Sequence, residues 1–231
     1  MGYDGYMPDA AARSLRKDAA LNRERLLAAA SELFAERGLD VTLNDIAHRA
    51  GVGVGTAYRR FANKEEVIDA LFEQRLQEVA ALANDALAAA DAWLGFVSFL
   101  EGSLQLQFGD RGLTQIMNNP HLGQARVNEA RDRIAPLIAD IVHRAQRQGA
   151  LRADFDQSDV IFIQVALTAV MDSTRELAPQ LYRRYLTMLL DGLRADERPL
   201  TPLPADALTA NQTHAAMTRK RRAAGTRNSP R

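Results

Sequence analysis

Apolar residues recur at helical spacing along almost the whole sequence, and no segment keeps the alternating pattern of a half-buried strand. This pattern predicts an all-α protein. The predicted helices cover approximately residues 20–37, 43–50, 54–61, 64–89, 92–108, 112–118, 122–148, 157–177 and 180–194. Residues 1–17 have the composition of a flexible arm. Residues 196–231 read as a disordered basic tail, with six bases and no acid from Thr218 onward.

Residues with clear capping chemistry mark the ends of the short helices near the start of the chain. Thr42 is suited to cap the helix 43–50, and Asp45 stands at its third position, where a carboxylate favours the exposed amides. Gly51 ends that helix, because glycine adopts the left-handed backbone conformation at low cost. Asn63, with Glu66 three residues later, predicts the start of the next helix.

The composition excludes several classes of protein. No apolar run reaches the roughly 18 residues needed to cross a bilayer, and the first 18 residues lack the apolar core of a secretory signal, so we expect a cytoplasmic protein. The absence of cysteine excludes disulfides and thiolate metal sites. The four histidines show no ligand spacing and no G-x-S-x-G occurs, so the sequence predicts no metal, no cofactor and no enzyme.

Charge is unevenly distributed, although 29 basic residues balance 29 acidic ones overall. Between Thr42 and Lys64 there are four bases and a single acid, Asp45. A local excess of positive charge is the electrostatic signature expected of a surface that binds phosphates.

The stretch GVGVGTAYRRFANKEE, residues 51–66, allows two kinds of phosphate binding. A dinucleotide-binding loop must follow a buried strand, whereas the segment LNDIAHRA before Gly51 is an amphipathic helix. The glycines at 51, 53 and 55 also miss the G-x-G-x-x-G spacing. Two short helices joined by a glycine turn instead indicate a helix-turn-helix, whose second helix enters the major groove of DNA.

The second of these helices carries residues suited to reading a duplex. Gly55 and Thr56 leave little bulk at its start, and Thr56 offers a hydroxyl and a methyl group to base edges. Arg59 and Arg60 can reach phosphate or guanine, while Tyr58 and Lys64 suit phosphate anchoring. Val54 could contact a thymine methyl or fill the flank of the preceding helix. Phe61, Ile46, Ala47 and Val52 are assigned to packing.

The segment TLNDIAHRAGVGVGTAYRRFANKEEVIDAL resembles the DNA-binding segment of the TetR family of bacterial transcriptional regulators. With the helix before it, the similarity covers about residues 20–72. It departs from the family pattern at Gly53, where serine is common, and at Val67, where leucine is usual. The matching residues are Thr42, Ile46, Ala47, Ala50, Gly51, Val52, Gly55, Thr56, Tyr58, Phe61, Lys64 and Glu65.

The resemblance implies an N-terminal three-helix helix-turn-helix domain over residues 18–64 and a C-terminal effector-binding and dimerisation domain over residues 65–195. It adds Thr42 and Asn44 to the expected DNA contacts. The implied function is repression, with release of a palindromic operator when a small molecule binds. The phrase GDRGLTQIM is similar to a segment of the SbtR-like subgroup.

The resemblance also implies a homodimer, formed through the last two long helices, 157–177 and 180–194, and an effector pocket. Ordinary intrachain core remains the alternative for both. A different class of function also stays open: an all-α ligand-binding protein or enzyme that kept the scaffold and lost DNA binding. The residues predicted to line the pocket are Trp93, Phe96, Phe99, Leu100, Gln105, Phe108, Met117, Phe162, Gln164 and Met171.

Overall fold

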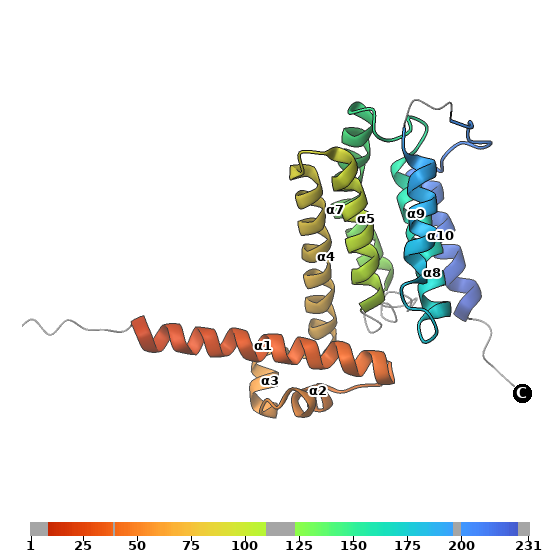
Figure 1. The fold of residues 1–231 in the computed structure, drawn as a ribbon. Coiled ribbons are helices and arrows are strands. Elements are labelled where there is room, and N and C mark those ends of the chain that lie inside the picture. Colours follow the sequence, from red (N-terminus) through yellow and green to blue (C-terminus); the bar gives the residue numbers. More distant parts are fainter. Residues whose placement is uncertain (1–8, 39, 110–122, 196–199, 226–231) are drawn as a thin grey trace, which may run out of the picture. The chain divides into compact units, whose positions relative to one another are not determined.

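The computed structural model describes residues 9–38, 40–109, 123–195 and 200–225 (Figure 1). Over these residues the chain forms helices and no strand, apart from an isolated bridge between Leu151 and Arg194, so the all-α prediction is confirmed. No helix in these ranges is long and apolar enough to cross a membrane. The helices are α1 (Asp9–Arg37), α2 (Leu43–Ala50), α3 (Val54–Arg60), α4 (Lys64–Ala88), α5 (Ala92–Gly109), α7 (Gly123–Arg147), α8 (Gln157–Thr174), α9 (Leu181–Leu193) and α10 (Ala210–Gly225).

The described chain divides into two compact units, one ending at Glu73 and the other beginning at Gln74. The division falls inside α4, later than the boundary at residue 64 expected from the sequence. In the first unit, α1 packs on α2 and α2 on α3. Its largest fully buried side chains belong to α1, α2 and α4: Leu26, Leu33, Phe34, Ile46 and Ile68.

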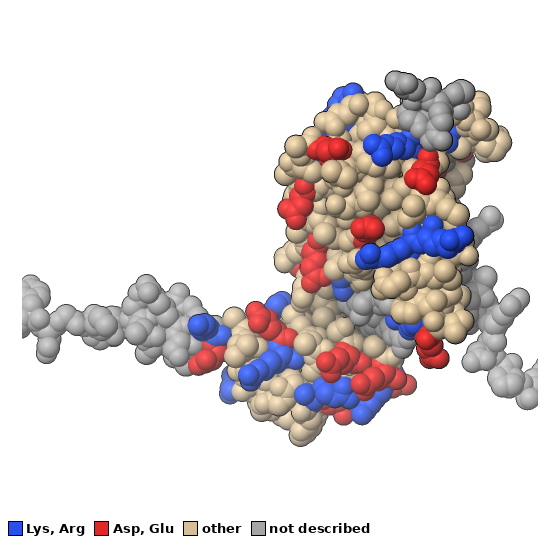
Figure 2. All heavy atoms as spheres, in the orientation of Figure 1, with Lys and Arg blue, Asp and Glu red and all other residues tan. Residues whose placement is uncertain are grey.

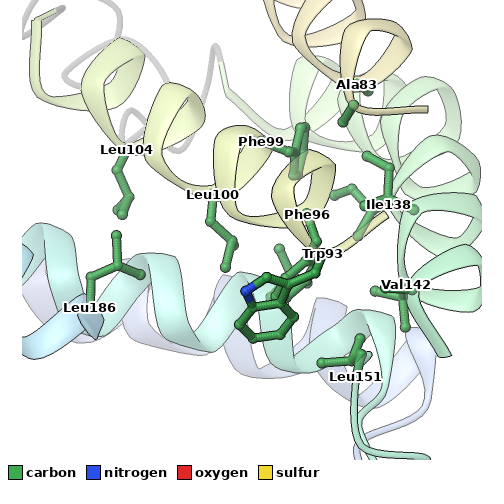
Figure 3. Close-up of a cluster of buried hydrophobic side chains, with 14 of the residues drawn as sticks. Ala83, Trp93, Phe96, Phe99, Leu100, Leu104, Ile138, Val142, Leu151 and Leu186 are labelled. Carbon is green, nitrogen blue, oxygen red and sulfur yellow. The ribbon is translucent and has the colours of Figure 1, made fainter. Parts of the chain in front are cut away.

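The second unit packs α5 and α8 against each other, with α7 against both and α9 against α8. Its core is aromatic at one end. The rings of Trp93 and Phe96 lie 5.9 Å apart, and Phe155 meets Phe96 edge-on at 5.8 Å. Figure 3 shows Trp93, Phe96, Phe99 and Leu100 together with Ile138 and Val142 of α7. This continuous apolar cluster is the source of the unit's stability.

Most predicted helix bounds are confirmed to within a few residues, but the N-terminal arm is not. A flexible segment was expected over residues 1–17, whereas α1 already begins at Asp9. The stretch from Ala10 to Lys17 is rich in alanine, arginine, leucine and lysine, which are strong helix formers. High helix propensity therefore outweighs the lack of a regular apolar stripe. The helix predicted over 112–118 lies outside the described residues.

The disordered tail predicted over residues 196–231 is also wrong for the part that forms α10. Thr209 and Gln212 form a reciprocal cap at its start. The Gln212 amide donates to Thr209 Oγ1 at 3.3 Å, and the Thr209 amide donates to Gln212 Oε1 at 2.9 Å. A Thr-x-x-Gln cap is a sequence signal for a helix start, and it precedes residues of good helix propensity.

Candidate nucleic-acid interface

A closed capping box at Thr42 fixes the start of α2. The Asp45 amide donates to Thr42 Oγ1 at 3.2 Å, while the Thr42 amide and hydroxyl donate to Asp45 Oδ2 at 2.8 and 2.5 Å. The hydrogen bonds from Thr42 hold the pKa of the Asp45 carboxyl below its usual range. These bonds give an eight-residue helix a defined first turn, as the sequence predicted.

The turn after α2 is a Schellman motif centred on Gly51. The Val52 amide donates to the Ala47 carbonyl at 3.0 Å, and the Gly51 amide donates to the His48 carbonyl at 3.2 Å. Gly51 has φ of 64°, in the left-handed region that favours glycine. Val52 is buried and anchors the turn in the core. The angle at which α3 leaves α2 is therefore set by backbone hydrogen bonds.

Helix α3 buries one side and exposes the other. Its carbonyl cap is Gly53, which accepts from the amides of Thr56 at 2.8 Å and Ala57 at 3.0 Å and supplies no side-chain cap. Ala57 is fully buried, whereas Tyr58 is 51% exposed and Arg59 and Arg60 are also exposed. Because Ala57 packs inward, the neighbouring positions along the helix point outward.

Thr56 and Arg59 act together on the outer side of α3. Arg59 Nη2 donates to Thr56 Oγ1 at 2.8 Å, one turn away along the helix. The bond orients the guanidinium over the start of α3. A threonine hydroxyl and an arginine fork at one place form a donor-rich surface of the kind that contacts base edges or phosphates.

The start of α4 completes this surface. Asn63 Oδ1 accepts from the Glu66 amide at 2.9 Å, and Glu66 Oε2 accepts from the Ala62 amide at 2.7 Å. The predicted pair is confirmed, with Ala62 as the partner of the glutamate. Phe61 is buried beneath it, and the Arg23 guanidinium of α1 lies 5.8 Å from the Phe61 ring centre. Lys64 follows as the first residue of α4.

The positive charge of this unit is smaller than the sequence suggests. Arg49 Nη2 lies 2.8 Å from Glu36, and Arg49 Nη1 lies 3.3 Å from Glu32, both on α1. The pairing holds the pKa of the Glu36 carboxyl below its usual range. Figure 2 accordingly shows basic and acidic side chains interspersed on the visible face of this unit. The arginines at 59 and 60 are therefore the main exposed bases of α3.

The structure collects the nine predicted contact residues on three adjoining pieces of the first unit: the start of α2, the length of α3 and the first residue of α4. The four residues assigned to packing, Ile46, Ala47, Val52 and Phe61, are all buried, as predicted. Exposed members of the contact set are Thr42, Asn44, Gly55, Tyr58, Arg59 and Arg60, and half-buried members are Val54, Thr56 and Lys64. Sequence reasoning missed the engagement of Arg49, because its partners lie 13 and 17 residues away.

The predicted pocket residues of the second unit separate into groups. Buried in the core cluster are Trp93, Phe96, Phe99, Leu100 and Met171, while Phe162 and Gln164 are half-buried. Gln105 is exposed, which contradicts a role inside the unit, because its neighbour Leu104 takes the inward position. The side chains of Phe108 and Met117 lie outside the described part. The buried set agrees with the ordinary-core alternative.

One polar pair crosses this apolar interior. Gln164 Nε2 of α8 donates to Ser103 Oγ of α5 at 2.7 Å, and Ser103 Oγ donates to the Leu100 carbonyl at 3.1 Å. Ser103 is buried. Buried polar groups of this kind are hydrogen-bonded and fix orientation in otherwise apolar surroundings. Among the described residues, no group of three or more potential metal ligands lies together.

Two family models match the chain. One, described as bacterial regulatory proteins of the tetR family, covers residues 26–71, which include α2 and α3. The other, described as the transcriptional regulator SbtR-like C-terminal domain, covers residues 88–195. The two matches follow the predicted division between a DNA-binding and a C-terminal region.

Individual proteins give the same result. The HTH-type transcriptional regulator SrpR of Pseudomonas putida is 28% identical over 150 residues, 63% of this chain and 70% of that protein. A TetR transcription regulatory protein of Mycobacterium vanbaalenii is 30% identical with a TM-score of 0.60, over 78% of this chain and 99% of that one. The ketosteroid transcriptional regulator KstR2 of Mycobacterium tuberculosis is 26% identical, with a TM-score of 0.58, over 75% and 95% of the two chains.

Proposed function

Because this chain belongs to the TetR family of DNA-binding transcriptional regulators, we propose that it is a cytoplasmic repressor which leaves a palindromic operator when a small molecule binds its second unit. The observation that carries the proposal is the exposed side of α3, held behind the Gly51 turn with Thr56, Tyr58 and Arg59 on it. A surface of this composition on a helix-turn-helix suits the major groove.

In this proposal the contact residues divide into readers and anchors. Thr56 and Arg59 read base edges near the start of α3, where Gly55 allows the backbone to approach closely. Tyr58, Arg60 and Lys64 bind phosphates, and the first turn of α4 adds amides that favour an anion. Thr42 and Asn44 bring the start of α2 to the backbone of the same half-site, and Val54 lies against a thymine methyl.

The operator is palindromic because the repressor is a homodimer. A seven-residue α3 reaches few bases, while two copies held about 34–36 Å apart read both half-sites. The last two long helices, α8 and α9, supply the dimer contact. Support comes from α9, which leaves Tyr185, Met188 and Leu189 exposed on its outer side.

The effector binds between α5 and α8, where the Ser103–Gln164 pair offers a polar partner inside an apolar cluster. The residues around it that would contact the molecule are Trp93, Phe96, Phe99, Leu100, Phe162 and Met171. A binding energy that differs by about 1–3 kcal/mol between the two dimer geometries changes operator affinity roughly 5- to 150-fold, which is enough to alter promoter occupancy.

Selection of bound duplexes from a random pool, followed by binding of single variants, tests the proposal. Tyr58→Ala and Lys64→Ala should weaken binding to all sequences alike, with Lys64→Ala lowering the salt slope by about one. Arg59→Ala should relax base preference at one position by about 1–3 kcal/mol. Arg147→Ala, which removes an exposed base from α7, is the control and should change neither property.

Failure to enrich any duplex would contradict DNA recognition by α3. Combined with turnover of a bound small molecule, it would favour the alternative of a scaffold that lost DNA binding and became an enzyme or carrier. Enrichment without any compound that releases the duplex would contradict the effector-controlled switch alone.

A further inference from the structure

The outer side of α9 carries a row of exposed apolar side chains. Tyr185, Met188 and Leu189 are 41%, 50% and 38% exposed. Gly192 continues the row, because positions i, i+3, i+4 and i+7 share one side of a helix. No atom lies within 4 Å of the place where a Cβ on Gly192 would stand. The protomer itself thus leaves open space at the end of this row.

A second apolar segment is held against the end of α9. The segment Leu200–Leu203, here called the strap, receives a hydrogen bond from Arg152, whose Nη2 donates to the Thr201 carbonyl at 2.7 Å. Arg152 Nη1 donates to the Gly192 carbonyl at 3.3 Å. One guanidinium therefore joins the strap to the last turn of α9, next to the open position at Gly192.

This attachment is built into the fold. Arg152 is only 7% exposed, and its Nε and Nη2 donate to the two carboxylate oxygens of Asp154 at 2.6 and 2.9 Å. The Asp154 carboxylate also accepts a bond from the Leu203 amide. The Arg152 amide donates to the Leu193 carbonyl at 3.0 Å, which ties the same loop to the end of α9. The strap backbone is therefore fixed at both ends.

The side chains on this fixed backbone point into solvent. Leu200 is 37% and Leu203 is 45% exposed. A clamped backbone cannot withdraw these side chains from water by local rearrangement. Contiguous exposed apolar surface on a well-ordered segment is typical of a protein contact.

We infer that the strap and the outer row of α9 form one face, and that a second copy of this chain covers it, with Gly192 where two α9 helices approach each other. A twofold dimer presents the same surface from both chains, so a row that lacks a cover in one protomer is supplied with one by the other. The inference rests on the proposed homodimer. It extends that contact to a segment beyond residue 195, where the matched family domain ends.

The test is the dimer dissociation constant of the full chain, measured by sedimentation at a series of concentrations. Leu200→Ser with Leu203→Ser should weaken the dimer by about tenfold or more, since buried apolar anchors carry much of the energy of an interface. Leu94→Ser with Leu177→Ser removes two exposed leucines elsewhere in the second unit and should leave the constant unchanged. Unfolding curves confirm that each variant is folded.

Two further variants separate this inference from the proposed function. Tyr185→Ser with Met188→Ser tests the α9 contact alone. If it weakens the dimer while the strap variant does not, the inference is overturned and the leucines belong to another occupant, such as α10 of the same chain. If neither changes the constant, α9 is not the dimer contact and the proposed homodimer loses its support.

Gly192→Leu tests the point of close approach. The added side chain meets nothing within the protomer, and leucine favours a helix more than glycine does, so the monomer should keep or gain stability. At a close helix crossing the same side chain obstructs the partner. A weaker dimer with an undiminished melting temperature supports the inference, and an unchanged dimer excludes close approach at Gly192.

Discussion

The turn between α2 and α3 and the end of the second unit around Arg152 are both held by hydrogen bonds, but over different distances in the sequence. In the turn, every printed bond joins residues five or fewer positions apart, such as Val52 to Ala47. Around Arg152 the bonds reach 40 and 49 positions, to Gly192 and Thr201. Nearby, the Ala92 amide donates to Gln148 Oε1 at 3.0 Å across 56 positions.

The difference corresponds to two tasks. The DNA-reading surface needs a defined local angle between two short helices, and caps and a glycine turn supply it without help from distant residues. The end of the second unit must hold four chain segments together, and side chains that donate to backbone carbonyls do this. Gln146 Nε2 alone donates to the carbonyls of Arg152, Ala153 and Phe155.

Replacing Arg152 should have the largest effect on stability. Arg152→Met leaves the carbonyls of Gly192 and Thr201 and the Asp154 carboxylate without their donor, which should lower the free energy of unfolding by about 2–4 kcal/mol. Denaturant unfolding of the full chain measures the change. Arg49→Met, which removes a solvent-exposed pair with Glu32 and Glu36, is the control and should shift the midpoint very little. Equal shifts would contradict the distinction between the two regions.

Much of the first unit could be predicted from the sequence because its determinants are neighbours in the chain. Thr42 with Asp45 specified the start of α2 at Leu43, and Gly51 specified its end. The spacing also identified the inward residues Ile46 and Val52, and with them the outward set around Tyr58. Only Arg49 was misjudged, since its acidic partners lie on α1.

The second unit could be predicted only as a set of helices. Periodicity identified α5, α8 and α9, yet it could not decide which apolar residues line a pocket and which fill the core, because both have the same spacing. The Arg152 clamp has no sequence signal, since its acceptors are backbone carbonyls that any residue could supply. The Thr209–Gln212 cap was present in the sequence, and the basic composition after it obscured α10.

Glycine replacements should have a smaller effect and sharpen the comparison. Gly51 and Gly149 both end a helix with positive φ, 64° and 67°, and both have open space around the added Cβ. Replacement of either by alanine should therefore cost a similar amount, about 1 kcal/mol, from backbone strain alone. Thermal unfolding measures this cost.

The two glycine variants should differ in DNA binding. Gly51→Ala disturbs the angle between α2 and α3 and should weaken operator binding beyond its effect on stability. Gly149→Ala lies in the second unit and should bind the operator as the original chain does under conditions where it is folded. Equal loss of binding in both variants would mean that the turn geometry is not what positions α3.

Acid should have the smallest effect and act on both regions through carboxylates. Hydrogen bonds from Thr42 lower the pKa of Asp45, and those from Arg152 lower the pKa of Asp154. A group whose pKa is depressed in the folded state stabilises that state above its unfolded pKa, near 3.9 for aspartate. This stabilisation disappears as pH falls through the folded pKa. We therefore expect both contributions to remain intact at neutral pH and to be lost progressively below about pH 4.

Asp45→Asn separates the two contributions, because asparagine can still accept the Thr42 amide bond but does not titrate. In this variant, carbon-detected magnetic resonance should show Asp154 titrating below 3.9 as in the original chain, while the amides at the start of α2 lose their acid dependence. Asp45 titrating at or above about 3.9 in the original chain would show that the capping box is open in solution. The local account of the α2–α3 geometry would then lack its first support.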